Sequence, residues 1–349
     1  MAVTKETLRA AADARKQLRQ LTDKQAVALV KAWVDAWDTL SPAFAEALAE
    51  LVAHGDRVPR TVVARNKKLI AALEQARATL EELIDYADAT VTNDVMTAVL
   101  DAATSHQAMI GTQLPPDGLG ATINVNAPAP GALQAIVTRT TEQIHSATKP
   151  LTAWTIQRMK QQLVRGIAVG DNPMKVARNL IKETEGEFNG GLARAMTIAR
   201  TEMLDAHRRS TLASNLANTD ILNGWIWMAT LDHKICPSCL AQHGTLHPAD
   251  EFGPIDHPNG RCAAVPKTVS WRDLGFDIDE PEDDIPDAKA WFDNLEEESQ
   301  LAIMGPTRLK LLTDGLIDWE DLSTQRTNTG WRDSIGVTNV GVLVKKAAR

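Results

Sequence analysis

Apolar residues recur at helical spacing through residues 5–111. Val27, Val30, Val34 and Trp37 lie three to four residues apart, which is the spacing of one face of a helix. This pattern predicts four or five helices whose apolar stripes form the core of a bundle. An alternative for the same stripes is a face offered to another protein, as in a coiled-coil seam.

Two local signals divide this region into separate helices. Thr22 and Gln25 have the spacing of a capping box, which predicts that a helix begins there. Ser41 followed by Pro42 has the form of an N-cap with proline at the first helical position. We therefore expect a boundary between two helices at this point.

The middle of the chain opens with a linker. Residues 112–131 are rich in proline and glycine and cannot form one continuous helix. Helical patterning then resumes, and Gly190-Gly191 is expected to break it. The predicted helices cover about residues 132–146, 152–167, 173–184 and 192–218.

The period of the pattern changes to two at Gly224. Trp225, Trp227 and Ala229 alternate with their neighbours, which predicts a strand. The segment that follows, through Pro266, is poor in apolar residues and rich in Gly, Pro, His and Asp. Something other than a hydrophobic core must hold this segment together.

The composition supports a helical, globular chain. Of the 349 residues, 44% are apolar and 23% charged, which argues against wholesale disorder, and aromatic residues are scarce at 4%, which favours helices over β-sandwiches. The net charge of −8 argues against a generic nucleic-acid coat. Residues 273–298 contain 12 Asp and Glu against one Lys, so the remainder has 36 basic and 33 acidic residues and a charge of +3.

This acidic segment predicts a solvated connector, with a docking surface for a basic partner as the alternative. Beyond it, residues 299–349 contain enough apolar residues for short helices. The last twenty residues lack periodicity and are expected to form an extended arm. The N-terminus has no apolar signal-peptide core, and no run of 18 apolar residues occurs, so we expect a soluble protein made in a cytoplasm.

Three cysteines and a histidine have the spacing of a metal site. Cys236 and Cys239 form a C-x2-C pair directly after the predicted strand, and His257 and Cys262 follow on a second turn. Three thiolates and one imidazole close a tetrahedral shell, which is typical of structural zinc. Such a site supplies folding energy to a segment that has little core of its own.

Other uses of these residues stay open. His233, His243 and His247 are near enough in sequence to replace a ligand. The simpler alternative is three unligated cysteines with ordinary loop histidines, and a redox C-x2-C pair is a further one, although no thioredoxin-like strand–helix context surrounds it. The signatures of zinc deaminases and of H-E-x-x-H proteases are absent. Asp256-His257-Pro258-Asn259 has part of a nuclease ββ-metal motif, which makes a zinc-dependent nuclease or another DNA-processing enzyme the alternative function.

Five motifs follow one another within residues 192–268. They are Ile198-Ala199-Arg200-Thr201-Glu202, Gly224 to Asp232, Cys236-Pro237-Ser238-Cys239, His243-Gly244 and His257 to Cys262. In this order and spacing, they resemble the phage head morphogenesis proteins typified by protein F of bacteriophage Mu. Looser agreement extends upstream to about residue 150, and residues 295–322 are similar to the segment that often follows the domain. The family commonly has a further cysteine where this chain has Gly260.

The resemblance implies a minor capsid protein of the virion, located in the head or at the portal vertex. Its implied partners are the portal protein and, as a further option, the major capsid or scaffold protein, and its implied role is head assembly and DNA delivery rather than catalysis. DNA is a second possible partner of the basic run near residue 60, although a solvated helix face explains the run more simply. The run consists of Arg57, Arg60, Arg65, Lys67 and Lys68.

The expected fold is mainly α, with an N-terminal long-helix region, a helical middle domain joined to a small α+β zinc-stabilised module, and an extended C-terminal tail. The expected divisions are 1–111 for the N-terminal helices, 112–131 for the linker, 132–272 for the Mu F-type domain with its zinc module at about 221–268, 273–298 for the acidic connector and 299–349 for the C-terminal helices and arm.

Overall fold

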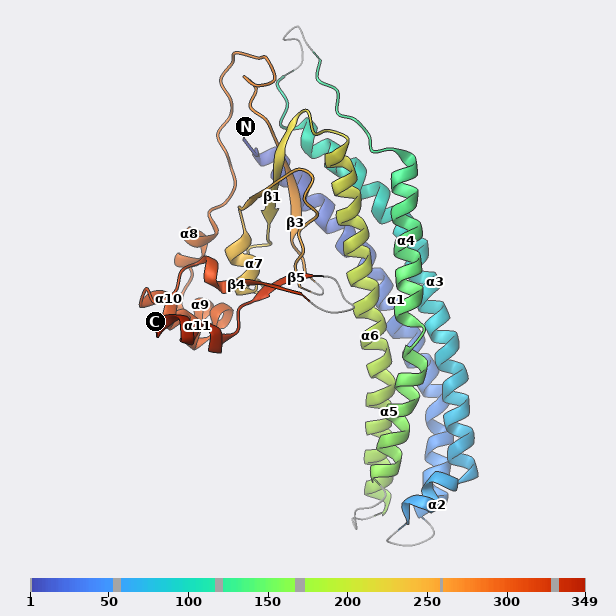
Figure 1. Cartoon of the computed structure of the whole chain (residues 1–349). Helices are drawn as coiled ribbons and strands as arrows, with labels where there is room; N and C mark the ends of the chain where they lie inside the picture. The colour runs from blue at the N-terminus through green and yellow to red at the C-terminus, as the bar shows by residue number, and fades with distance from the viewer. Residues whose placement is uncertain are drawn as a thin grey trace. The chain divides into compact units, whose positions relative to one another are not determined.

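A computed structural model describes residues 2–52, 58–116, 122–166, 173–257, 260–327 and 333–348 (Figure 1). It is mainly helical, as predicted, with 66% of the described residues in helices and two small sheets among them. The chain forms two compact units, which we call the helical unit and the sheet unit. The helical unit comprises Arg19–Met96 and Thr138–Met203, and the sheet unit comprises Met1–Leu18, Thr97–Val137 and Leu204–Arg349.

Among the described residues, the helical unit contains parts of α1, α3, α4 and α6 together with the whole of α2 and α5, all labelled in Figure 1. The long helices α1, α3 and α6 also contribute a part each to the sheet unit. No helix of the described residues is long and apolar enough to cross a membrane. The bounds are α1 Lys5–Val52, α2 Arg60–Arg65, α3 Lys67–Gly111, α4 Pro130–Thr148, α5 Leu151–Gly166 and α6 Pro173–Leu216.

The core of the helical unit is apolar and contains several aromatic rings. Trp33, Phe44 and Phe188 are fully buried, and the ring centroids of Trp37 and Phe188 lie 5.3 Å apart. Leu29, Trp33 and Trp37 recur every four residues and so define the buried face of α1. The periodicity therefore correctly predicted helical structure and placed Trp37 in the core. The number of helices was wrong, because the described part of residues 5–111 contains α1, α2 and α3 rather than four or five helices.

The three valines of the same stripe are not in that core. Val27, Val30 and Val34 are 70%, 41% and 51% exposed, so the prediction that they are core residues was wrong. They lie beside the tryptophan face of α1 rather than on it, because a helix advances about 100° per residue. The alternative, a face offered to another protein, stays a prediction.

Helix α1 continues through both of the predicted boundaries. The hydroxyl of Thr22 donates to the carbonyl of Arg19, and Gln25 donates to the Asp94 carboxylate at 2.8 Å, so neither residue caps a helix. Pro42 lies inside α1 with its ring exposed. Buried side chains on both sides of Pro42, Leu40 and Phe44 among them, favour one continuous helix over a break.

The predicted break at Gly190-Gly191 is also wrong, because both glycines lie inside α6. A Cβ on Gly191 would lie 2.7 Å from the hydroxyl oxygen of Thr155 on α5, which is closer than Cβ atoms approach other heavy atoms in real proteins. A Cβ on Gly190 would meet the Trp154 ring at 3.7 Å. The glycines therefore serve close packing of α6 on α5 rather than termination of a helix.

The sheet unit is built around β1 Leu222–Met228, which confirms the predicted strand. It is the central strand of a three-stranded antiparallel sheet (Figure 1), in which Trp225 pairs with His247 and Trp227 with Ala264. The two partners are β2 Leu246–His247 and β3 Ala263–Thr268. Alternate residues of β1 belong to two different apolar clusters.

The C-terminal region is folded rather than extended. Its buried side chains, such as Phe292, Leu322 and Leu343, belong to the same apolar cluster as Trp225 and Trp227. The prediction that the last twenty residues form an extended arm was therefore wrong. Apolar side chains of the C-terminal region are buried against the strand and turns of the cysteine segment, which has few apolar residues of its own, and this burial stabilises the folded arrangement. The elements are α8 Ala288–Asp293, α9 Glu297–Met304, α10 Pro306–Thr313, η1 Glu320–Leu322, β4 Ser323–Arg326, β5 Ser334–Val337 and α11 Val340–Ala347.

The acidic segment is mostly exposed, as a solvated connector should be, yet it has defined contacts. Asp283 accepts from the backbone N–H of Val3 at 2.8 Å and from the Lys267 ammonium at 2.6 Å. The N–H of Asp284 donates in turn to the Val3 carbonyl at 2.9 Å. The segment therefore attaches the first residues of the chain to the sheet unit.

Candidate metal centre

The two cysteines of the C-x2-C pair lie at the start of the short helix α7 Pro237–Gln242. Cys236 is the N-cap, and its sulfur accepts a hydrogen bond from the N–H of Cys239 at 3.3 Å. Pro237 occupies the first helical position, where its missing N–H costs nothing. This capped turn directs both thiols to the same side.

The structure brings His257 to this turn. The ligand atoms of Cys236, Cys239 and His257 all lie within 4.8 Å of one another. In a tetrahedral zinc site with Zn–S bonds near 2.3 Å, two sulfur ligands are about 3.8 Å apart. The three side chains are therefore placed, and chemically suited, to hold one zinc ion after small adjustments.

Cys262, the fourth predicted ligand, is buried and forms a hydrogen bond with the Cys239 thiol. Its sulfur lies outside the group of three that meets the 4.8 Å limit among the described residues. The complete ligand set of Cys236, Cys239, His257 and Cys262 stays a prediction.

The thiols influence one another electrostatically. Hydrogen bonds with Cys239 and then with His257 lower the pKa of Cys236 to about 4, despite burial. Hydrogen bonds with Cys236 and Cys262, together with burial, raise the pKa of Cys239 well above its ordinary value. Neighbouring thiolates repel one another in a buried place, and a bound dication removes that penalty.

The other histidines considered as ligands have different partners. Both ring nitrogens of His243 bond to the backbone: the N–H of Ala229 donates to Nδ1 at 3.1 Å, and Nε2 lies 3.1 Å from the Pro286 carbonyl. Burial lowers the pKa of His243, which keeps the ring neutral for these bonds. His243 therefore joins the end of β1 to the acidic segment instead of binding metal.

His247 also has protein partners, in this case side chains. Its ring stacks on Trp225 with centroids 4.2 Å apart, and its nitrogens contact the Thr245 hydroxyl at 2.9 Å and the Glu251 carboxylate at 3.0 Å. His233 is exposed. Among the described residues, the metal-binding group contains none of these three histidines.

Sequence reasoning missed the ion pair that joins the turn of His257 and Cys262 to the loop that follows β1. Arg261 makes two hydrogen bonds to Asp232, of 2.6 and 2.7 Å, and the Arg261 guanidinium lowers the pKa of Asp232 to about 2. Both residues lie in the motifs quoted above, but their 29-residue separation gives no local signal that they pair.

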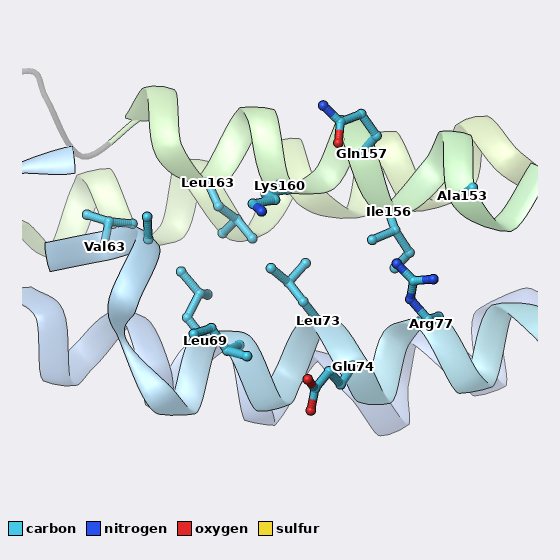
Figure 2. A pocket seen from close by; sticks show the side chains of 12 residues that line it. Val63, Leu69, Leu73, Glu74, Arg77, Ala153, Ile156, Gln157, Lys160 and Leu163 are labelled. Carbon is cyan, nitrogen blue, oxygen red and sulfur yellow. The ribbon is translucent and has the colours of Figure 1, made fainter. Parts of the chain in front are cut away.

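A separate cavity of about 360 Å³ lies within the helical unit. Figure 2 shows Leu69 and Leu73 of α3 facing Ile156 and Leu163 of α5 across it, with Lys160 beside them. The sequence did not predict this cavity. Nothing in the described residues shows what would occupy it.

Fold and site together define a mainly helical protein with a compact cysteine–histidine module. The model of the family described as "Phage Mu protein F like protein" matches residues 157–265, just under a third of the chain, and this confirms the resemblance to Mu F-type head morphogenesis proteins. The matched segment contains all four predicted ligands. No curated protein and no solved structure matches the chain.

Proposed function

We propose that this protein is a structural minor component of a phage head, bound to the portal and acting in procapsid assembly and in DNA packaging or delivery. The observation that carries the proposal is the overlap of the family match, residues 157–265, with the cysteine–histidine cluster. The virion is accordingly the expected location, and we expect no enzymatic activity.

We infer that the cysteine–histidine cluster holds one zinc ion with a structural role. The donors are sulfur and imidazole nitrogen, which zinc prefers, and the group contains no carboxylate. With Cys262 as the fourth ligand, the shell is closed and has no position left for a catalytic water. A closed shell favours the structural role over the alternative of a zinc-dependent nuclease.

Metal analysis of the purified protein tests the zinc site. We expect one zinc per chain, lost in Cys239→Ser and kept in Ser238→Ala, because Ser238 lies in the same turn but bonds to the Ser323 hydroxyl at 3.1 Å. DNA cleavage that depends on zinc and disappears in His257→Ala without loss of fold would contradict the structural role.

The proposed portal contact is tested on assembled particles. We expect the protein to copurify with the portal protein of the same phage, from heads as well as from co-expressing cells. Quantitative mass spectrometry of purified heads gives the copy number relative to portal and capsid proteins. Absence of the protein from both procapsids and virions would contradict a structural role in the head.

The basic run near residue 60 is the proposed contact with DNA. Arg60, Arg65, Lys67 and Lys68 are exposed, as phosphate-binding residues must be, while Arg57 lies outside the described residues. The ammonium of Lys68 is already paired, at 2.7 Å from Glu46 and 3.1 Å from Glu50.

DNA binding measured over a range of salt concentrations tests this contact. If Arg60, Arg65 and Lys67 each touch a phosphate, neutralising all three reduces the salt dependence by a slope of roughly 3. An unchanged slope would assign these residues to a solvated helix face.

A further inference from the structure

A buried ion pair joins α6 to the turn that carries His257 and Cys262. Arg208 on α6 and Asp256, the residue before His257, approach to 2.7 Å, and their side chains are only 10% and 1% exposed. Both residues belong to the sheet unit. A buried ion pair adds little net stability compared with apolar residues of similar size, so its placement points to a positioning role.

The pair holds the backbone of Cys262 from two directions. The N–H of Cys262 donates to the second carboxylate oxygen of Asp256 at 3.2 Å, and the Arg208 guanidinium donates to the Cys262 carbonyl at 3.3 Å. Because the backbone fixes the direction of the Cα–Cβ bond, these bonds hold Cβ of Cys262 in place and leave only the staggered χ1 rotamers for its sulfur. Asp256 is also covalently joined to His257, so it affects both predicted ligands of this turn.

Gly260 makes room for this arrangement. A Cβ at Gly260 would lie 1.9 Å from one carboxylate oxygen of Asp256 and 2.1 Å from its Cγ. The Asp256 carboxylate therefore occupies the space that any side chain at position 260 would need. The N–H of Gly260 also donates to the His257 carbonyl at 2.9 Å and closes the turn.

We propose that Arg208, Asp256 and Gly260 are positioning residues that hold His257 and Cys262 in place to bind zinc. This inference rests on the proposed zinc site. Groups that orient metal ligands without touching the metal commonly change affinity by about 10- to 100-fold when they are replaced. The same loss is expected here, because a misaimed thiol no longer completes the tetrahedron.

Zinc affinity, measured by competition with a chromophoric chelator, tests the ion pair. Arg208→Gln and Asp256→Asn should each bind zinc about 10- to 100-fold more weakly than the unmodified protein. Arg209→Gln is the matched control: Arg209 neighbours Arg208 on α6 and pairs with Asp205 at 2.7 Å, one helical turn away. We expect this control to keep the affinity of the unmodified protein.

Cobalt substitution separates positioning from general destabilisation. In variants that remain folded by far-ultraviolet circular dichroism, the absorption bands of tetrahedral cobalt–thiolate should weaken or shift for Arg208→Gln and Asp256→Asn only. Unchanged zinc affinity and cobalt spectra would overturn the positioning role alone. Failure of the unmodified protein to bind zinc would instead overturn the zinc site and, with it, this inference.

A double-mutant cycle tests Gly260 independently of whether single variants are destabilised. Gly260→Ala should weaken zinc binding about 10-fold or more when Asp256 is present. In an Asp256→Ala background the space is already open, so adding Gly260→Ala should cost less than about threefold. Additive losses in the two backgrounds would contradict the proposed competition for space.

Discussion

The helical unit and the cysteine module of the sheet unit, residues 222–268, are stabilised by different kinds of interaction. The helical unit buries the faces of long helices in one apolar cluster that includes Trp33 and Phe188. The module has short elements joined by turns and relies on polar ties such as Asp232–Arg261, on the thiol cluster, and on apolar side chains supplied by the C-terminal region. The helical unit should therefore be sensitive to lost volume, and the module to metal and pH.

The largest effect is expected from removing zinc. A structural zinc site in a small module commonly accounts for about 10 kcal/mol or more of apparent binding free energy. With a chelator present, hydrogen exchange measured by mass spectrometry should show lost protection over residues 222–268. Protection of the core residues of α1 should remain. Equal protection of the module with and without metal would show that its apolar contacts suffice.

Loss of core volume should have the converse effect. Phe188→Ala removes a fully buried ring that contacts Trp37, and we expect the free energy of unfolding to fall by about 3–5 kcal/mol. Zinc content should stay at one per chain. Val27→Ala is the matched control on an exposed site and should change stability by less than about 0.5 kcal/mol. A comparable loss in both variants, measured by urea unfolding, would refute the assigned core.

Acid should weaken the sheet unit through a buried histidine. Burial lowers the pKa of His106 to about 4, and its Nε2 lies 2.5 Å from the Asn215 side-chain oxygen. Between its ordinary pKa of 6.5 and about 4, the unfolded chain binds a proton that the folded chain does not. Stability therefore falls as the pH is lowered through this window, by up to roughly 3 kcal/mol.

Urea unfolding between pH 7 and pH 4.5 checks the histidine effect. Metal binding at the proposed zinc site also depends on pH, so the informative quantity is the difference between the unmodified protein and His106→Gln. The variant should lose less stability on acidification. His207, whose pKa burial also lowers to about 4, is a second contributor, and His207→Gln should act in the same direction. Parallel pH curves for all three proteins would contradict this account.

The smallest effects are expected from two alanine substitutions in α6, and they should have opposite signs. Gly191→Ala places a methyl group against Thr155 and should destabilise the helical unit by about 1–3 kcal/mol. Gly186→Ala meets no atom within 4 Å and should stabilise the same helix by up to about 1 kcal/mol. Thermal unfolding measures both effects. Destabilisation by Gly186→Ala would contradict the explanation that packing against Thr155, rather than helix position alone, makes Gly191→Ala unfavourable.

Local patterns predicted the central strand and the cysteine turn of the module better than the boundaries of the long helices α1 and α6. The two-residue alternation at Trp225 and Trp227 predicted β1, and the spacing of Cys236 and Cys239 predicted a turn that presents two thiols together. These features depend on neighbours in sequence. Predictions of helix ends were wrong where a residue far away in the sequence determines the local structure. Gly191 is an example, because its lack of a side chain matters only where Thr155 packs against it.

The C-terminal helix α11 shows the same limit. Asn339 caps it by accepting from the N–H of Gly341 at 2.8 Å, and Leu343 is buried in the cluster that contains Trp225. Eight residues are too few to show a clear helical period, and an isolated helix of this length is unstable in water. Burial of Leu343 supplies the stability that local pattern and propensity do not.

The helical class, the central strand and the family resemblance were predictable from residue types at short, regular spacing, and the same kind of signal proposes four zinc ligands. Three-dimensional packing was needed to show that Val27, Val30 and Val34 are exposed, that α6 is continuous, and that both ring nitrogens of His243 bond to the backbone. It also placed the Asp256 carboxylate in the space left by Gly260. These outcomes depend on which residues far apart in the sequence contact one another, and the spacing of residue types along the chain does not contain that information.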